Sequence, residues 1–145
     1  MTTVNGRTIG LAHHAGRAVA ERVLDRHGIG FLDHLALRAA LAADGPFTPD
    51  DLADRLSDDL KNDHAVSKEA VTYLAARGYL EFFDGPRLLR PTDAGRALFA
   101  TASAAVAEVS ARLYAGLTEE ELTVAGRVLD VVTERANAEL AELEG

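Results

Sequence analysis

The sequence predicts a mainly α-helical protein that carries one small β-hairpin. Three neighbouring signals support this fold class. Apolar residues recur at helical spacing in two stretches, one beginning near Thr48 and the other between Asn62 and Ser67. Two short β-prone runs follow, and the Asp-Gly-Pro sequence at 84–86 between them is a strong turn signal. A helix, a loop, a second helix and a hairpin, in this order, form the outline of a winged helix-turn-helix.

The first helix of this motif has clear start signals. Thr48 supplies a capping hydroxyl, and Pro49 suits the first helical position. The two aspartates that follow lie in the first turn, where the positive end of the helix dipole stabilises negative charge. The apolar pattern ends near Ser57. The sequence therefore predicts a long acidic loop over 57–64 before the second helix.

The second helix of a helix-turn-helix is the one that enters the major groove of DNA. We expect Val66, Ala70 and Leu74 to face the core, and we expect the helix to end at Gly78. Its other side chains, with basic residues of the preceding loop and of the hairpin, are the candidates for contact with double-stranded DNA. They are Lys61, Ser67, Lys68, Thr72, Tyr73, Arg87 and Arg90.

Further helices are predicted on both sides of the motif. Two amphipathic helices lie before it, over 8–27 and 31–43, and glycine-containing breaks end both of them. Residues 1–7 are expected to be a loose start. A third helix, rich in alanine, begins at a threonine cap after the hairpin and covers about 92–115.

The last predicted helix has an apolar stripe longer than a core of this size could cover. It begins at a capping box formed by Thr118 and Glu121. The stripe consists of Leu122, Ala125, Val128, Leu129, Val132, Ala136, Leu140 and Leu143. Its simplest partner is the same helix of a second copy, which predicts a homodimer.

Length and composition favour one domain over residues 1–145. Within it, 8–43 and 93–143 would form a helical dimerisation region, and 44–92 the winged helix-turn-helix. The absence of cysteine excludes disulfides and thiolate metal sites, which suits a reducing compartment. There is no signal peptide and no apolar run that could span a bilayer, so we expect a cytoplasmic protein without membrane contact.

Four motifs resemble, in order and spacing, those of the MarR (multiple antibiotic resistance regulator) family. Residues 52–56 (LADRL) and 74–80 (LAARGYL) are similar to its helix-turn-helix signatures, and 91–98 (PTDAGRAL) and 116–122 (GLTEEEL) to two of its helix starts. The resemblance covers nearly the whole chain. It implies a dimer held by the first and last helices, with a winged helix in each subunit and a ligand cleft between these regions. It also implies a repressor that small, often aromatic or anionic molecules release from an operator.

Two features depart from the family pattern. The hairpin is short, so only Arg87 and Arg90 could take the part of the arginine that the family inserts into the minor groove. The net charge is −8, and residues 44–96 hold seven basic and eleven acidic side chains. A lobe that binds DNA is normally basic, because neutralised phosphates supply much of the affinity.

A second set of candidates lies on the first two helices. His34 and Arg38 are one turn apart and share a side with apolar neighbours. Charge-assisted hydrogen bonds from such groups could hold a small anionic or aromatic ligand in the cleft. The candidate ligand-binding residues are His13, Arg17, Phe31, His34 and Arg38.

A purely structural interpretation of these residues is also open. In this interpretation, His13 and His27 are interface residues whose ring nitrogens have hydrogen-bond partners. Arg38 then pairs with a carboxylate such as Asp33 or Glu108. No histidine or carboxylate spacing typical of a metal site is present, and no glycine-rich phosphate loop. We therefore expect neither a metal nor a cofactor.

Three functions follow from these patterns. The first is a ligand-responsive transcription regulator that binds DNA as a homodimer. The second is a protein of the same fold that has lost operator binding and only binds a small molecule. The third is a cofactor-free enzyme, in which His13 or His34 acts as acid or base and Arg17 or Arg38 stabilises an anion.

Overall fold

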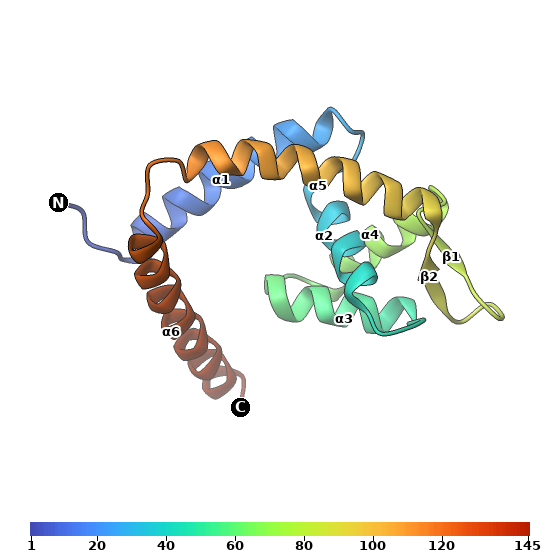
Figure 1. Ribbon diagram of the computed structural model, residues 1–145. Coiled ribbons are helices and arrows are strands. Elements are labelled where there is room, and N and C mark those ends of the chain that lie inside the picture. The colour runs from blue at the N-terminus through green and yellow to red at the C-terminus, as the bar shows by residue number, and fades with distance from the viewer. The chain divides into compact units, whose positions relative to one another are not determined.

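The computed structural model describes all residues from 1 to 145. The chain divides into two compact units, Met1–Glu108 and Val109–Gly145. The structure confirms a mainly α-helical fold with one antiparallel hairpin (Figure 1). The elements are α1 (Gly6–Asp25), α2 (Phe31–Ala42), α3 (Pro49–Leu60), α4 (His64–Ala76), β1 (Leu80–Phe82), β2 (Leu89–Pro91), α5 (Asp93–Leu113) and α6 (Glu119–Glu144).

The predicted capping of α3 is confirmed. The Thr48 hydroxyl oxygen accepts a hydrogen bond from the Asp51 backbone N–H at 3.1 Å, and the Asp51 carboxylate accepts one from the Thr48 N–H at 3.4 Å. Two N–H groups that the helix itself cannot satisfy are paired in this way. The start of α3 is thus fixed by residues three apart in the sequence.

The end of α3 differs from the prediction. The helix continues past Ser57 to Leu60, so the long acidic loop expected over 57–64 is wrong. Lys61 takes a left-handed conformation, with φ 54°, and its N–H still donates to the Ser57 carbonyl at 2.8 Å. Only residues 61–63 separate α3 from α4, which gives an ordinary short turn. The apolar pattern ends earlier in the sequence than the helix, because the residues in the last turn of α3 are exposed apart from Ser57.

Ser67 on α4 is buried, although we expected it to face outward and Val66 to face the core. The Ser67 hydroxyl donates to Asn62 Oδ1 at 2.9 Å and accepts from the Ser57 hydroxyl at 3.1 Å. These bonds satisfy the hydroxyl inside the α3–α4 contact. Val66 instead is 44% exposed. Ser67 is therefore removed from the surface that DNA could reach.

The end of α4 agrees with the prediction. Gly78 has φ 79°, a conformation that favours glycine, and its N–H donates to the Ala75 carbonyl at 3.1 Å. The Tyr79 N–H donates to the Leu74 carbonyl at 2.9 Å. This pair of bonds is a Schellman motif, which closes the helix and directs the chain into β1.

The hairpin pairs three residues on each strand. Leu80 lies opposite Pro91, and Phe82 lies opposite Leu89. Phe47, from the loop between α2 and α3, exchanges two backbone hydrogen bonds with Leu89, at 3.1 and 2.7 Å. The hairpin is thereby attached to the segment that precedes the helix-turn-helix.

A close backbone approach joins the hairpin to α5. The Thr92 hydroxyl donates to the Gly78 carbonyl at 2.7 Å and accepts from the Gly95 N–H at 3.0 Å. A Cβ atom on Gly95 would lie only 2.2 Å from the Tyr79 carbonyl oxygen. The threonine and glycine of the 91–98 motif therefore fix how α5 leaves the winged helix.

One hydrophobic core unites the elements of residues 1–108. It is built from the end of α1, from α2 to α4, from both strands and from one turn of α5. Its largest buried side chains are Leu24, Leu37, Leu52, Val71, Leu74, Leu80 and Leu89. The core thus lies under the helix-turn-helix and holds α3 and α4 in place.

Helices α1 and α6 also begin at capping boxes. Asn5 caps α1 together with Thr8, so the helix starts within the segment that we expected to be loose. The predicted box of Thr118 and Glu121 is confirmed at the start of α6. No residue of α6 is buried in the single chain. None of the helices combines the length and hydropathy needed to cross a bilayer.

We expect Gly95→Ala to destabilise the fold, because the new methyl group would overlap the Tyr79 carbonyl oxygen. Forcing a group into a packed site of this kind costs on the order of 2 kcal/mol or more. Urea denaturation followed by circular dichroism measures the change. Gly10→Ala is the matched control, since a Cβ atom there meets nothing within 4 Å. Equal stability of the two variants would contradict the close approach.

Candidate functional site

The exposed side of α4 carries three of the seven side chains that were predicted to contact DNA. Lys68, Thr72 and Tyr73 are exposed, while Ala70, Val71 and Leu74 are buried. This division follows from helical spacing, because residues three and four apart share a side. The structure therefore brings three of the candidates together on one exposed face.

Lys68 is paired with an acidic residue at the start of α3. Its Nζ atom lies 2.8 Å from Asp50 Oδ1, and the same oxygen lies 3.2 Å from His64 Nε2. His64 Nδ1 is 2.8 Å from Asp54 Oδ1. The hydrogen bond from Lys68, followed by that from His64, lowers the pKa of Asp50. We call Asp50, Asp54, His64 and Lys68 the α3–α4 ion cluster.

The part of His64 in this cluster was not predicted from the sequence. Both ring nitrogens of His64 lie within hydrogen-bond distance of carboxylate oxygens, Nδ1 facing Asp54 and Nε2 facing Asp50. The spacing of Asp50 and Asp54, one helical turn apart, was visible in the sequence. That His64 lies opposite them depends on the short turn between α3 and α4, which the sequence pattern did not predict.

The basic residues of the hairpin differ in their surroundings. Arg90 Nε lies 2.9 Å from Glu81 Oε1 across the strand pair, and its guanidinium carbon is 4.1 Å from the centre of the Phe83 ring. Arg87 is exposed in the loop between the strands. Lys61, in the turn before α4, donates to the backbone carbonyl of Asp58. Arg90 is thus engaged on the hairpin, whereas Arg87 points to solvent.

A cavity of about 360 Å³ contains three of the predicted ligand-binding residues. Arg17 donates to Glu21 at 2.8 Å, and its guanidinium carbon lies 4.7 Å from the centre of the Phe31 ring. The lining comes from α1, α2, the end of α3 and the start of α4. It consists of His13, Arg17, Phe31, Leu32, Leu35, Asp59, Leu60, Asn62 and Val66. We call this the α1–α2 cavity.

No protein-family model and no curated protein sequence matches the chain. Solved structures do match. Apo MarR from E. coli is 20% identical, with a TM-score of 0.69 over 91% of this chain and 98% of that one. The MarR-family protein Rv2887 of Mycobacterium tuberculosis, in complex with DNA, is 19% identical, with a TM-score of 0.70 over 90% and 98%.

The chain has the MarR fold. A MarR-family regulator from Rhodococcus sp. RHA1 agrees equally well, with 19% identity and a TM-score of 0.70 over 93% of this chain and 96% of that one. The Mycobacterium protein was also solved with p-aminosalicylic acid, at 20% identity and a TM-score of 0.67 over 90% and 99%. At these identities the similarity establishes the fold.

Within this MarR fold, the five predicted ligand-binding residues do not share one cavity. His34 and Arg38 do not line the α1–α2 cavity. His34 is buried on the other side of α2, where its Nε2 lies 3.1 Å from the Ser103 hydroxyl and its ring stacks on Phe99 with centroids 5.2 Å apart. Arg38 is exposed and makes no ion pair with Asp33. The expected cluster is therefore divided between two places.

The environment of His34 favours the neutral imidazole. Burial, followed by the positive charge of Arg38, lowers the pKa of His34 below its usual value. A neutral ring can exchange one hydrogen bond with the Ser103 hydroxyl and stack on Phe99 without bringing a charge into the apolar contact. This arrangement supports a structural role for His34 at the junction of α2 and α5.

We expect His34 to make stability depend on pH. The unfolded chain takes up a proton near the ordinary histidine pKa of about 6.5, whereas the folded chain takes it up at lower pH. The stabilisation by neutral His34 is therefore complete above that value and is lost as the pH falls toward the lowered folded pKa. Urea denaturation at pH 7.5, 6.5 and 5.5 measures the free energy of unfolding. We expect the difference in this free energy between wild type and His34→Gln to decrease as the pH falls.

His14→Gln is the control for this experiment, because His14 is exposed. The difference in unfolding free energy between wild type and His14→Gln should not decrease in the same way. A constant difference between wild type and His34→Gln over the three pH values would contradict a neutral, buried His34.

Proposed function

We propose that the chain is a MarR-family transcription regulator that represses as a DNA-bound homodimer and responds to a small anionic or aromatic ligand. One observation carries the proposal. Helix α4 buries one side against the core and presents Lys68, Thr72 and Tyr73 on the other. In a helix-turn-helix the second helix enters the major groove. The complex of the Mycobacterium protein with DNA supports this use of the fold.

The pairing of Lys68 with Asp50 is compatible with DNA binding. Both side chains are exposed, so water and salt screen their attraction. A phosphate can therefore replace Asp50 as the partner of Lys68. Lys61 and Arg87, both exposed, are the other cations proposed to meet the backbone. Thr72 and Tyr73 are proposed to meet bases or sugars between these contacts.

The apolar stripe of α6 supports the proposed homodimer. Leu122, Leu129 and Val132 are 39%, 44% and 44% exposed in the single chain. A contiguous apolar helix surface of this kind is typical of an association site. Residues 8–43 and 93–143 would form the dimerisation region, and the resulting symmetry would place two α4 helices in successive major grooves.

The α1–α2 cavity is the proposed effector site. Its volume of about 360 Å³ is near the lower end of small-molecule sites, which span roughly 300–1,000 Å³. Arg17 and His13 can donate to an anion, and Phe31 can pack on an aromatic ring. Asn62 and Val66, next to and on α4, also line it. A ligand that fits one arrangement of α4 better than another would shift the population that binds DNA.

The electrostatics favour a second candidate function. Lys68 and Arg90 are each paired with a carboxylate, and the chain carries −8. The second candidate is a MarR-fold protein that does not bind an operator and that binds or transforms a small molecule in the α1–α2 cavity. Such a protein would not need unpaired cations on α4. Of the proposed catalytic residues, His13 and Arg17 line this cavity, whereas His34 and Arg38 do not.

Operator binding can be tested with the upstream region of the gene and an unrelated fragment of equal length. We expect Lys68→Ala to weaken binding and to lower the slope of log K against log salt by about one per subunit, because one phosphate contact is lost. Asp50→Asn should strengthen binding at low salt, since it frees Lys68 from its carboxylate. Fluorescence anisotropy over a salt series measures both effects.

Arg22→Ala is the matched control, because it removes an exposed positive charge from α1. It should leave the salt slope unchanged. If neither the wild type nor Asp50→Asn binds either fragment at low salt, the regulator proposal fails and the second candidate function is favoured. Identical salt slopes for wild type and Lys68→Ala would contradict the assignment of Lys68.

We expect Leu129→Glu to convert the homodimer to a monomer, because a charge would be buried in the apolar stripe of α6. Light scattering after size-exclusion chromatography at micromolar concentration measures the mass. Arg127→Glu is the control, since Arg127 lies outside the stripe. A wild-type protein that is monomeric under these conditions would refute the proposed dimer.

A further inference from the structure

Four exposed side chains form a line along the side of α4 that is opposite the core. They repeat at helical spacing, so they share one side of the helix. They are Ala65, Glu69, Thr72 and Ala76. We call this line the crest of α4. The core lies on the other side, where Val71 and Leu74 are fully buried. If α4 enters a groove of DNA, its crest is the part that reaches the bases.

Glu69 is the only charged residue on the crest. The two alanines carry no polar side-chain atom, so only Glu69 and Thr72 can exchange hydrogen bonds with bases there. Helix α4 begins at His64, which places Glu69 in its N-terminal half. In a helix-turn-helix, residues of this half meet the base edges. A carboxylate therefore lies where the bases of a bound operator would be read.

No interaction within the chain accounts for a carboxylate at this position. The residues three and four positions away share its side of the helix, and none of them is basic. They are Ala65, Val66, Thr72 and Tyr73. Glu69 makes no ion pair, whereas Lys68 beside it is paired with Asp50. The helix dipole favours negative charge in the first turn, and Glu69 lies beyond it.

Positive side chains flank the crest on both sides. By helical spacing, Lys68 lies on one flank and Tyr73 on the other. The guanidinium carbon of Arg77 is 6.0 Å from the centre of the Tyr73 ring. Contacts of such cations with phosphates hold a protein on the duplex but carry no sequence information. The discrimination between bases is therefore left to the crest.

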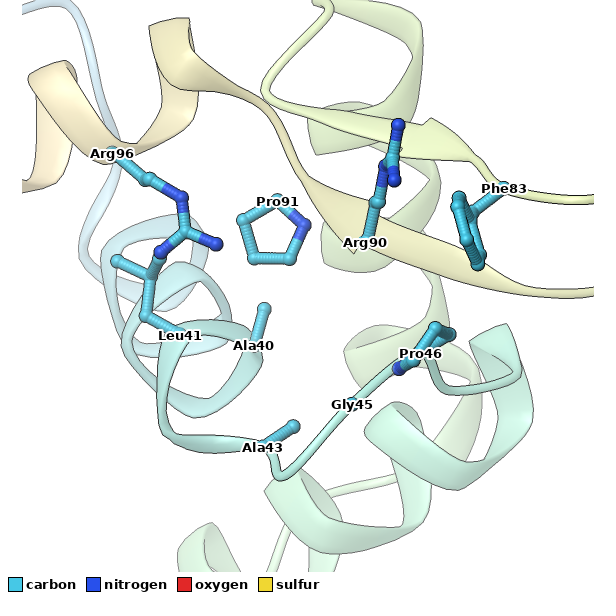
Figure 2. A pocket seen from close by; sticks show the side chains of 9 residues that line it. All are labelled: Ala40, Leu41, Ala43, Gly45, Pro46, Phe83, Arg90, Pro91 and Arg96. Atoms are coloured by element: carbon cyan, nitrogen blue, oxygen red, sulfur yellow. The ribbon is translucent and has the colours of Figure 1, made fainter.

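The hairpin does not take over this task in the major groove. Arg90 is held by the Glu81 carboxylate and by the Phe83 ring. Figure 2 shows Arg90 and Phe83 at the base of the hairpin, where they line a cavity of about 260 Å³. Arg87 is the one basic residue of the hairpin that makes no ion pair. A single exposed arginine in the loop between the strands leaves α4 as the main source of base contacts.

We propose that Glu69 selects cytosine in the operator. This role rests on the proposed binding of DNA and names a base that such binding requires. The Glu69 carboxylate accepts a hydrogen bond from the cytosine N4 amino group in the major groove. Adenine also has an amino group there, but its N7 acceptor lies beside it, and guanine and thymine offer acceptors. Opposite these bases the carboxylate is left unpaired among phosphates, so Glu69 also acts against wrong sequences.

The test is the selection of bound duplexes by the full chain from a pool with random central positions. We expect the wild type to enrich cytosine at one position of each half-site. Glu69→Gln should enrich adenine there instead, because glutamine pairs with adenine N6 and N7. Glu69→Ala should enrich no base at that position, and the other positions should keep their preferences. Glu144→Gln, which removes an exposed carboxylate at the end of α6, is the control and should still select cytosine.

The amino group can also be tested alone. Replacing the selected cytosine by 2-pyrimidinone, which lacks only the N4 amino group, should weaken binding by the wild type about tenfold. The same replacement should weaken binding by Glu69→Ala much less, as measured by fluorescence anisotropy at one salt concentration. Selective binding with identical base preferences in wild type and Glu69→Ala would overturn the role of Glu69 and leave the regulator proposal intact. If the wild type binds no sequence selectively, both proposals fail.

Discussion

The arrangement of the winged helix depends on one junction, where the Thr92 hydroxyl links the end of α4 to the start of α5. It donates to the Gly78 carbonyl and accepts from the Gly95 N–H. The Thr92 N–H donates to the Tyr79 carbonyl, which occupies the space that any side chain on Gly95 would need. Helix α4, the hairpin and α5 thus meet at a single backbone contact.

Much of the fold was predictable because its signals are local. The caps at Thr48 and Thr118 join residues three apart, and Gly78 ends α4 through bonds within six residues. Such interactions depend on the backbone at one place, so the sequence specifies them directly. The turn at 84–86 belongs to the same class. Fold class and element order could therefore be inferred without knowledge of long-range contacts.

The errors concern contacts between segments that are distant in the chain. The Ser57 hydroxyl donates to the Ser67 hydroxyl, and Ser67 is buried although it appeared polar enough to be exposed. His34 is paired with Ser103, 69 residues away, and is thus separated from the cavity of His13. Helical periodicity places a residue on a side of its own helix. It does not identify the element that this side will meet.

The acidity of the helix-turn-helix has a consequence for the proposed recognition. Where Lys68 is already paired with Asp50, a DNA phosphate only exchanges one partner for another, so the sequence-independent part of the binding energy is small. The proposed regulator would then draw its affinity from base contacts and from the proposed dimer. Weak non-specific binding raises the ratio of specific to non-specific affinity, which decides occupancy among many competing sites. In the proposed regulator, the carboxylates beside α4 would therefore weaken non-specific binding to DNA.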